Sequence, residues 1–264
     1  MSSSQLVDEV WEQLVCEAKV QSANEPILSS FYQVSILSHR NFAEALASYT
    51  GSKLHSHALS AAVICQEYER AIEQNPAIVI SACKDINACY QRDPACDLYS
   101  RPFLFFKGYH ALQSYRLAHY MWAEGRRDLA LFLQNRISRA FDVDIHPAAT
   151  LGDGIMMDHA TGIVIGETAT VGNNVSLLHS VTLGGSGCEK TECRRHPQVG
   201  DGVLISTGAK LLGNIKIGNG AKIAAGSVVL KDVRAHTTVA GVPAKVIGVP
   251  VEQEPALDMN QQLK

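Results

Sequence analysis

The 264-residue sequence contains no uninterrupted apolar run long enough to cross a membrane. Its first residues, 1–5, lead directly into a mixed charged and apolar segment, so we expect no secretory signal peptide. A strong charge bias is also lacking, because 23 Lys and Arg stand against 26 Asp and Glu. That balance argues against a nucleic-acid-binding protein, although a local basic patch could still bind a phosphorylated ligand. With 46% hydrophobic residues, the composition is typical of a globular protein with an ample core.

Cysteine is present, but without the spacing of a disulfide framework. The seven cysteines are odd in number and scattered along the chain. They are Cys16, Cys65, Cys83, Cys89, Cys96, Cys188 and Cys193. The first five lie among apolar positions of the helical half, where a thiol packs as a small hydrophobic group. Reduced thiols explain this usage better than disulfides do, and we therefore expect a cytoplasmic protein.

Glycine is almost missing from the first half of the chain. Residues 1–140 hold only Gly51, Gly108 and Gly125, whereas the other seventeen of the 20 glycines follow residue 150. Apolar residues at helical spacing run through this first half. They predict helices over residues 6–18, 58–73, 77–91, 103–123 and 127–140. Asp93 precedes Pro94, and the residue before a proline is driven into extended backbone, so we expect Asp93 in a loop between two helices.

The glycine-rich half carries an apolar repeat with a period of six. Twelve of its thirteen positions are Ile, Leu, Met or Val, and the other is Ala. The positions are Ile145, Leu151, Met157, Ile163, Ala169, Val175, Val181, Val199, Ile205, Leu211, Ile217, Ile223 and Val229. Neither a strand, with period two, nor a helix, with period 3.6, produces a strict six. A parallel β-helix does, because each face is one short strand and its corner with one inward residue. Three faces predict an eighteen-residue coil; a sandwich with accidental spacing is the alternative.

The repeat is interrupted between residues 184 and 196, where the segment GGSGCEKTECRRH is too polar and glycine-rich to form a face. We expect a loop extruded from one coil, and long loops on rigid scaffolds commonly serve function. The predicted architecture is therefore a helical domain over residues 1–140, a β-helix domain over 141–248 and a tail over 249–264. Four to five coils at about 4.8 Å per layer make a short prism, whose flat outer faces favour a closed trimer.

Acids and imidazoles cluster between residues 142 and 168, where they alternate with inward residues and must project from the prism. Asp144 and His159 are fifteen residues apart, which places them on adjacent layers with an offset that side chains could bridge across a corner. A carboxylate that holds an imidazole N–H fixes its tautomer and raises its basicity, as a general base requires. The alternative for His159 is a surface or interface histidine.

Several strings in the chain closely resemble bacterial serine O-acetyltransferases. They are RDPA (92–95), FFKGYHALQSYR (105–116), DIHPAA (144–149), DHATGIVIGETA (158–169), VTLGG (181–185), RRHP (194–197) and AGVPAKVIG (240–248). The hexapeptide repeat and AGVPA are shared by many acyltransferases and are therefore weakly specific. The string DHATGIVIGET, when it follows a helical domain that contains RDPA, is much more specific for this family. The resemblance covers about residues 5–255. It implies a left-handed β-helix that transfers an acetyl group from acetyl-CoA to L-serine, the first step of cysteine biosynthesis.

The resemblance also implies roles for individual residues. In that family the histidine of DHATG is the general base and the aspartate of DIHPAA orients it, which assigns His159 and Asp144 as a catalytic dyad. The implied serine-binding residues are Asp93, Asp158, Arg195 and His196, with Glu167 in a supporting role. This division suits an amino acid, whose ammonium requires acids and whose carboxylate requires a guanidinium.

Acetyl-CoA is the expected co-substrate, and we expect no metal because a base and an oxyanion donor suffice. A backbone N–H near Gly184 and Gly185 is the candidate oxyanion donor. CoA would lie in a groove between neighbouring prisms. Its candidate contacts are Gly185, Thr207 and Ala225 for the pantetheine arm, and Lys222 and Lys245 for the phosphates.

Three alternatives compete with this function. A γ-class carbonic anhydrase would bind zinc through three histidines, for which His146, His159 and His179 are available, but its H-x4-H pair is absent. A sugar acetyltransferase shares the prism but lacks the long helical first half. The third alternative is a scaffold or regulatory partner of the sulfhydrylase that consumes O-acetylserine, into which the family commonly inserts a C-terminal isoleucine.

The chain departs from the family at two places. The tail matches DMNQ (258–261) but ends in Lys264, which puts the sulfhydrylase complex in doubt. The loop carries Cys188 and Cys193, which with His196 form the spacing C-x4-C-x2-H. Three states of these cysteines are compatible with this spacing: free thiols, a disulfide or part of a zinc site. The family further implies feedback inhibition by L-cysteine at the serine site and two trimers joined through their helical halves.

Overall fold

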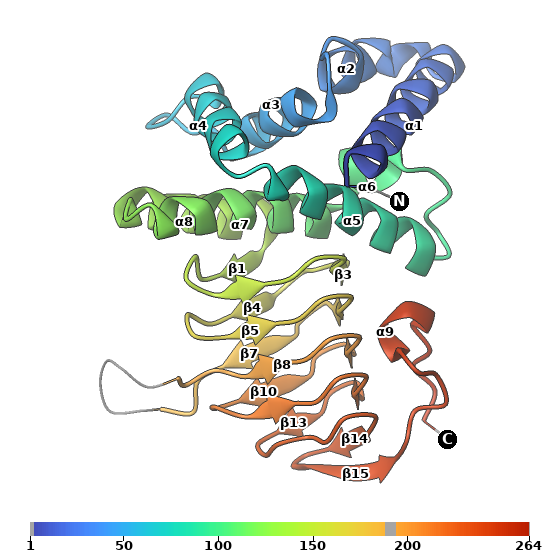
Figure 1. Ribbon diagram of the computed structural model, residues 1–264, viewed down its shortest axis with the longest axis vertical. Coiled ribbons are helices and arrows are strands. Elements are labelled where there is room, and N and C mark those ends of the chain that lie inside the picture. The colour runs from blue at the N-terminus through green and yellow to red at the C-terminus, as the bar shows by residue number, and fades with distance from the viewer. Residues whose placement is uncertain (1–2, 188–193, 264) are drawn as a thin grey trace.

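A computed structural model describes residues 3–187 and 194–263, and it places a layered helical part on top of a solenoid of stacked coils (Figure 1). The helices before the solenoid are α1 (Ser3–Asn24), α2 (Ser29–Tyr32), α3 (Phe42–Leu54), α4 (Ala61–Gln74), α5 (Ala77–Arg92), α6 (Ser100–Phe105), α7 (Lys107–Ala123) and α8 (Arg127–Phe141). Of these, α5, α7 and α8 form the layer that lies directly on the solenoid (Figure 1). No helix within these two described ranges is long and apolar enough to cross a membrane.

The described strands of the second part form three sheets, which are the three faces of a prism. Sheet A contains β1 (Val143–Ile145), β4 (Ile163–Ile165), β7 (Thr182–Gly184), β10 (Lys210–Leu212) and β13 (Val228–Val229). Sheet B contains β2 (Thr150–Leu151), β5 (Thr170–Val171), β8 (Gln198–Val199) and β11 (Lys216–Ile217). Sheet C contains β3 (Met156–Asp158), β6 (Ser176–Leu178), β9 (Leu204–Ile205), β12 (Lys222–Ile223), β14 (Thr238–Gly241) and β15 (Ala244–Gly248). All pairings are parallel except that of β14 with β15, so the second half is a parallel β-helix as the repeat predicts.

The prediction that stacked residues are always eighteen apart is wrong for two of the coils. Val143 pairs with Ile163, twenty residues later, and Thr182 pairs with Lys210, twenty-eight residues later. The expected offset of eighteen holds elsewhere, for example between Val164 and Thr182. The first coil therefore contains two extra residues, and a later coil contains ten.

The strict period of six survives these insertions because each face buries two residues, not one. On β4 both Ile163 and Ile165 are buried, since alternate residues of a strand point to the same side. After the insertion of two residues, the six-residue repeat falls on the other of the two inward positions of each face. The ten extra residues of the later coil then return the repeat to the first inward position. Hydrophobicity alone cannot detect such a shift. The two extra residues lie in the corner between β3 and β4, which contains His159.

The helical part confirms the expected helices apart from one break, and it adds helical segments between residues 26 and 54 that were not expected. The segment 103–123 is two helices, because Phe106 has extended backbone between α6 and α7 (φ −87°, ψ 107°). The break lets the first turn of α7 lie against β3, where a side chain at Gly108 would overlap the Met157 carbonyl. Helix α3 was not expected, although Asn41 caps it by accepting a hydrogen bond from Glu44 N (3.0 Å).

Asp93 has extended backbone directly after α5, as the following proline predicts (φ −95°, ψ 110°). Its Oδ1 accepts a hydrogen bond from Ala95 N (2.8 Å). This bond holds the carboxylate at the end of the helix, over the first coil. The position of Asp93 is therefore set by where α5 ends.

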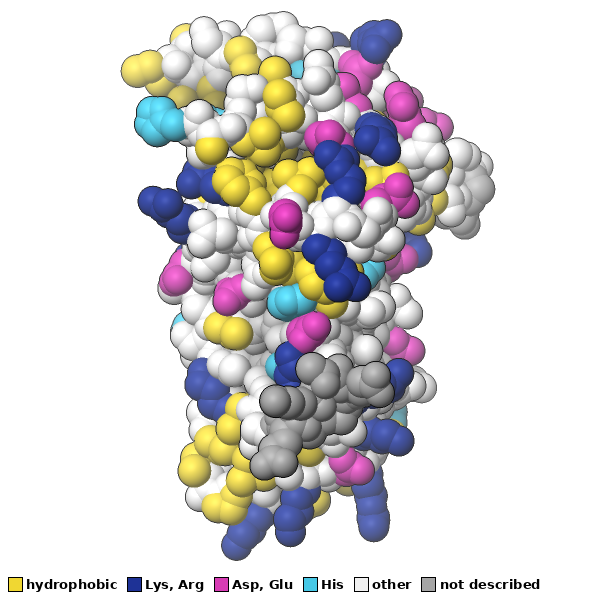
Figure 2. All heavy atoms as spheres, turned by 90° about the vertical axis from the view of Figure 1, so that its left-hand side faces the viewer, with side chains coloured by type: hydrophobic (Ala, Val, Ile, Leu, Met, Phe, Trp, Pro, Cys, Tyr) yellow, Lys and Arg dark blue, Asp and Glu magenta, His cyan; other side chains and the backbone are white. Residues whose placement is uncertain are grey.

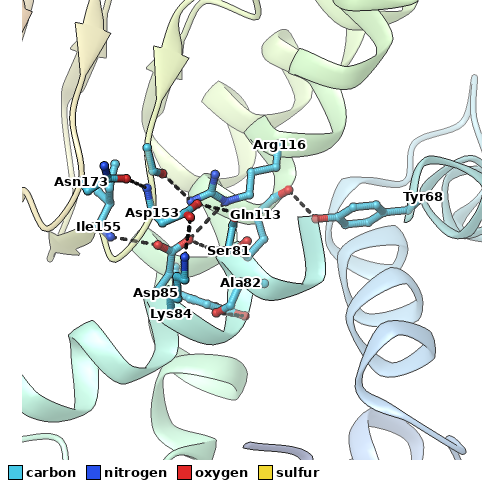
Figure 3. A network of polar contacts seen from close by, with 12 residues as sticks. Tyr68, Ser81, Ala82, Lys84, Asp85, Gln113, Arg116, Asp153, Ile155 and Asn173 are labelled. Atoms are coloured by element: carbon cyan, nitrogen blue, oxygen red, sulfur yellow. Dashed lines mark hydrogen bonds and ion pairs between the residues drawn. The ribbon is translucent and has the colours of Figure 1, made fainter. Parts of the chain in front are cut away.

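A buried charge network joins α5 and α7 to the first coil (Figure 3). The Asp85 carboxylate, which is fully buried, accepts from Arg116 Nη2 (2.6 Å), Gln113 Nε2 (2.9 Å) and Ile155 N (2.9 Å). Arg116 Nη2 also donates to Gly152 O (3.0 Å). Because Ile155 directly precedes β3, this network, called the Asp85 clamp below, fixes β3 beneath α5.

The C-terminal tail returns along sheet C to the helical part (Figure 1). Its short helix α9 (Pro255–Asp258) contacts α5 and β9, and Ser176 Oγ donates to Ala256 O (2.8 Å). Met259 then packs on a small cluster formed by Ala88, Cys89 and Met156. The tail thus touches both parts of the molecule.

We expect the stability of the helical part to fall below neutral pH because of His110. Its ring N–H donates to Phe103 O (2.8 Å), and burial lowers the pKa of His110 to about 4. In the unfolded chain the imidazole has its ordinary pKa near 6.5, so between pH 6.5 and 4 only the unfolded state gains a proton. The free energy of unfolding should therefore decrease by about 3 kcal/mol over that interval. Urea denaturation of wild type and His110→Gln at pH 7 and 4.5 measures this, and equal pH dependence in both proteins would contradict it.

Candidate functional site

A pocket of about 420 Å³ opens where α5, α7 and the end of β3 meet. Asp93, Asp158, His159 and Lys107 line its polar side, and Cys89 is among its apolar lining residues. The structure thus brings three of the expected site residues together: two acids and the imidazole. Asp93 comes from the end of α5, whereas Asp158 and His159 come from the end of β3.

The corner that carries His159 has unusual backbone geometry. His159 and Ala160 both have left-handed backbone (φ 54° and 59°), as does Gly162 (φ 72°). Consecutive non-glycine residues in this region are uncommon and each costs on the order of 1–3 kcal/mol, so neighbouring contacts must hold the corner. The effect is to push the imidazole outward, where its side chain is 75% exposed.

Few side chains contact the His159 imidazole directly. Its Nε2 lies 3.7 Å from Asp158 Oδ1, and its ring meets that of His179 edge to face, with 5.9 Å between the centroids. The direction of the imidazole therefore depends mainly on the backbone of the corner.

A second polar group lies at the corners between sheets A and B. Arg195 Nη2 forms an ion pair with Glu167 Oε2, and Thr168 Oγ1 accepts from Arg195 N (2.9 Å). His196 Nδ1 accepts from Thr168 N (3.1 Å), so in the neutral ring Nε2 carries the proton. Figure 2 views the left-hand side of Figure 1, where histidine, acidic and basic side chains gather near the middle of the molecule.

Burial sets the protonation of the histidines in this second group. Burial lowers the pKa of His196, and the neighbouring Arg195 lowers it further, whereas Glu167 raises it. Burial likewise lowers the pKa of His146. Both rings are therefore neutral near pH 7, and the positive charge of the group belongs to Arg195.

Within one chain, the two groups lie at opposite ends of β4. His159 precedes this strand and Glu167 follows it, and neither Arg195 nor His196 lines the pocket that contains His159. One chain therefore does not bring Arg195 and His196 to the pocket of Asp93, Asp158 and His159. The expected serine residues form two half-sites, each on a separate corner.

Asp144 lies between the half-sites, on β1 and opposite Val164 of β4. Its Oδ1 accepts a hydrogen bond from Gln134 Nε2 (2.6 Å). Among the described residues no hydrogen bond joins Asp144 to His159, so their pairing as a dyad stays a prediction.

The expected CoA contacts are spread over several faces. Gly184 and Gly185 lie at the end of β7 beside the second half-site, with Gly185 close to Arg195 O and His196. Thr207 and Ala225 are at the opposite edge of sheet A, in the corners where β10 and β13 begin. Lys222 is buried on sheet C, where its Nζ donates to Gln262 O of the tail (2.8 Å), and Lys245 is on β15.

Two residues that shape these half-sites were not predicted from the sequence. Lys107 lines the pocket and donates to Thr161 Oγ1, while Thr168 organises the Arg195 and His196 backbone. The signals for Lys107 were its place within FFKGYHALQSYR (105–116), one of the strings that carry the resemblance, and its position just before Gly108. Cys188 and Cys193 lie outside the described residues, and within those residues no three His, Cys, Asp or Glu side chains are grouped as a metal site.

These features define the class of the protein. A hexapeptide family model, "Bacterial transferase hexapeptide (six repeats)", matches residues 196–231, and the solenoid is the left-handed parallel β-helix of hexapeptide acyltransferases. A second model, "Serine acetyltransferase, N-terminal", matches residues 10–114. The chain is 52% identical over 252 residues to the serine acetyltransferase of Salmonella typhimurium, covering 96% of this chain and 92% of the relative. The chain belongs to the serine acetyltransferase family, whose acetyl donor is acetyl-CoA.

Solved structures of this family have the same fold. A serine acetyltransferase in complex with cysteine is 50% identical with a TM-score of 0.94, covering 96% of this chain and 98% of that one. The soybean serine acetyltransferase complexed with serine is 48% identical with a TM-score of 0.89, covering 92% and 99%.

Proposed function

We propose that this chain acetylates the hydroxyl of L-serine with acetyl-CoA, giving O-acetyl-L-serine and CoA as the first step of cysteine synthesis. The observation that carries the proposal is the pocket in which Asp93 and Asp158 lie beside the His159 imidazole. Two carboxylates suit the ammonium of an amino acid, and an imidazole suits removal of a hydroxyl proton. The family membership and the serine complex of the soybean relative support this choice of substrate.

The reaction is a direct transfer without an acyl-enzyme. The His159 imidazole takes the proton of the serine hydroxyl while the oxygen attacks the thioester carbon, and Asp144 orients the imidazole. The resulting oxyanion is stabilised by a backbone N–H near Gly184 and Gly185. When the tetrahedral intermediate breaks down, the C–S bond cleaves and the imidazolium returns its proton to the CoA thiolate.

A second copy of the chain completes the site. Serine has its ammonium and carboxylate on one carbon, so the acids and the Arg195 guanidinium must approach within a few ångströms of each other. The two half-sites of one chain lie at opposite ends of β4, which makes a site between neighbouring prisms the simplest arrangement. A closed trimer supplies three such sites, with CoA in the groove between prisms. In this arrangement Arg195 and His196 of one copy face Asp93 and His159 of another.

Release of free thiol from acetyl-CoA, with and without L-serine, tests the function. Serine-dependent release with one thiol per O-acetylserine formed supports it. Release that requires a sugar and does not respond to serine would replace it with the sugar acetyltransferase alternative, and would leave Asp93 and Arg195 without a role.

We expect L-cysteine to compete with serine for this site, because the two amino acids share the ammonium and carboxylate that the half-sites recognise. Arg195→Ala should therefore raise the KM for serine and the inhibition constant for cysteine by similar factors, each about tenfold or more, since a charge-assisted contact of about 1.5–3 kcal/mol is lost. Steady-state inhibition kinetics measure both constants. Cysteine inhibition that is undiminished in Arg195→Ala would exclude a shared site. The cysteine complex of a relative supports the proposal.

A further inference from the structure

We infer that Lys107 is a positioning residue for His159, which it holds in place through Thr161. The inference rests on the proposed role of His159 as general base. Lys107 is the first residue of α7, and its Nζ donates to Thr161 Oγ1, two residues beyond His159. The contact connects the helical layer directly to the corner that carries the imidazole.

The need for such a contact follows from the backbone of the corner. The equivalent corner of the next coil turns with a single left-handed residue, Ser180 (φ 61°). The His159 corner contains two more residues than this one, and two of its non-glycine residues, His159 and Ala160, are left-handed, so it projects further and stores more strain. A strained, projecting loop keeps one conformation only where its surroundings hold it.

Short backbone hydrogen bonds close the corner on itself, from Ala160 N to Asp158 O (2.6 Å) and from Thr161 N to His159 O (2.8 Å), and two longer-range bonds attach it to the coils. Gly162 N donates to Asp142 O (2.8 Å), and Ser180 N donates to Thr161 O (2.7 Å). Both bonds lie on the β4 side of His159. From the α7 side, Gly108 lies directly against Met157, and the Lys107 ammonium is the group that reaches the Thr161 side chain.

The consequence for His159 is large because its imidazole has few other contacts. In one chain the side chain is 75% exposed, so the backbone at 159–161 sets where the ring lies, and the proposed contact with Asp144 then orients it. A base must lie within about 3 Å of the proton it removes, so a small rotation of the corner costs catalysis without loosening substrate binding. Lys107 therefore contributes to turnover rather than to affinity.

A direct role for Lys107 is the competing explanation, because the same ammonium lines the pocket with Asp93 and Asp158. A cation there could bind the serine carboxylate. Thr161 lines the same pocket, so the two explanations are separated by the kinetic constant that changes. Positioning through the Lys107–Thr161 contact lowers kcat at nearly constant KM, whereas direct binding raises the KM for serine.

The test compares Lys107→Met, Thr161→Val and the double variant in the full-length protein. Positioning predicts that each single variant lowers kcat about tenfold, with the KM for serine changed less than twofold, and that the double variant is no worse than either single variant. Lys107→Arg, which keeps a cationic donor, should recover most of the activity. Thr161 is exposed and valine has its shape, so Thr161→Val tests the inference even where Lys107→Met folds poorly.

Lys84→Met is the matched control, because Lys84 also links a helix to the first coil, through Asp153 (2.9 Å), but does not contact the His159 corner. It should keep the wild-type kcat. Wild-type kcat in Thr161→Val, or a raised KM for serine without loss of kcat in Lys107→Met, would overturn the inference. Absence of serine-dependent transfer in the wild type would instead overturn the proposed function.

Discussion

Replacing His159 by Ala should lower kcat for serine-dependent CoA release by about 10²–10⁴-fold, the usual contribution of a general base. The KM for acetyl-CoA should change little, because the proposed role of the imidazole is to contact the attacking hydroxyl and not the CoA chain. The assay is thiol release at saturating acetyl-CoA. His57→Ala is the matched control, since His57 is exposed on the helical part and does not line the pocket. Equal loss in both variants would show a general defect and would remove His159 from the mechanism.

A mixing experiment then tests whether the site is shared between copies. His159→Ala and Arg195→Ala are each expected to be nearly inactive when alone. If the proposed trimer assembles from both variants co-expressed at equal amounts, a site is intact when its His159 comes from one variant and its Arg195 from the other. Random assembly makes about one quarter of the sites intact, so we expect about one quarter of the wild-type activity. Activity no higher than that of the two separate variants would place the complete site within one chain.

The second large effect is expected at the Asp85 clamp. Arg116→Met leaves the Asp85 carboxylate buried with its main partner gone, which should lower the free energy of unfolding by about 3–5 kcal/mol. Chemical denaturation followed by circular dichroism measures the loss. The double variant Asp85→Asn, Arg116→Met has no unpaired buried charge and should regain part of the stability, because the side-chain oxygen of the introduced amide can still accept from Ile155 N.

The control for this prediction is an ion pair of the same type at the surface. Arg101 and Asp97 pair at 3.0 Å with both side chains substantially exposed, so Arg101→Met should leave the denaturation midpoint almost unchanged. A similar small effect of Arg116→Met would show that the clamp does not join the two parts of the molecule. Because the clamp holds the residue before β3, a large effect should be accompanied by weaker serine binding.

The architecture could be predicted from the sequence because its two halves differ in glycine content and in apolar period. The register of the first coil could not. The six-residue repeat continues from Met157 to Ile163 although two extra residues lie between them. Ile163 nevertheless occupies the other inward position of its face. Two buried residues per face, separated by two, make an insertion of two invisible to any hydrophobic pattern.

The candidate site was predictable as a set of residues but not as an arrangement. Asp93, Asp158 and His159 do meet in one pocket. Arg195 and His196 are held elsewhere by Thr168, because a corner of a β-helix is fixed by its place in the coil rather than by the ligand it serves. The break at Phe106, which brings Lys107 to Thr161, depends on a close approach between α7 and β3 that no local pattern records.

The contact of the tail with the helical part has a consequence for the order in which the molecule is completed during synthesis. Coils can stack one after another as they leave the ribosome, since each contacts only its neighbours. The cluster of Ala88, Cys89 and Met156 must wait for Met259, which follows them by more than a hundred residues. Cys89 also lines the pocket. The cluster behind one wall of the pocket is therefore completed only after both the helical part and the coils have been made.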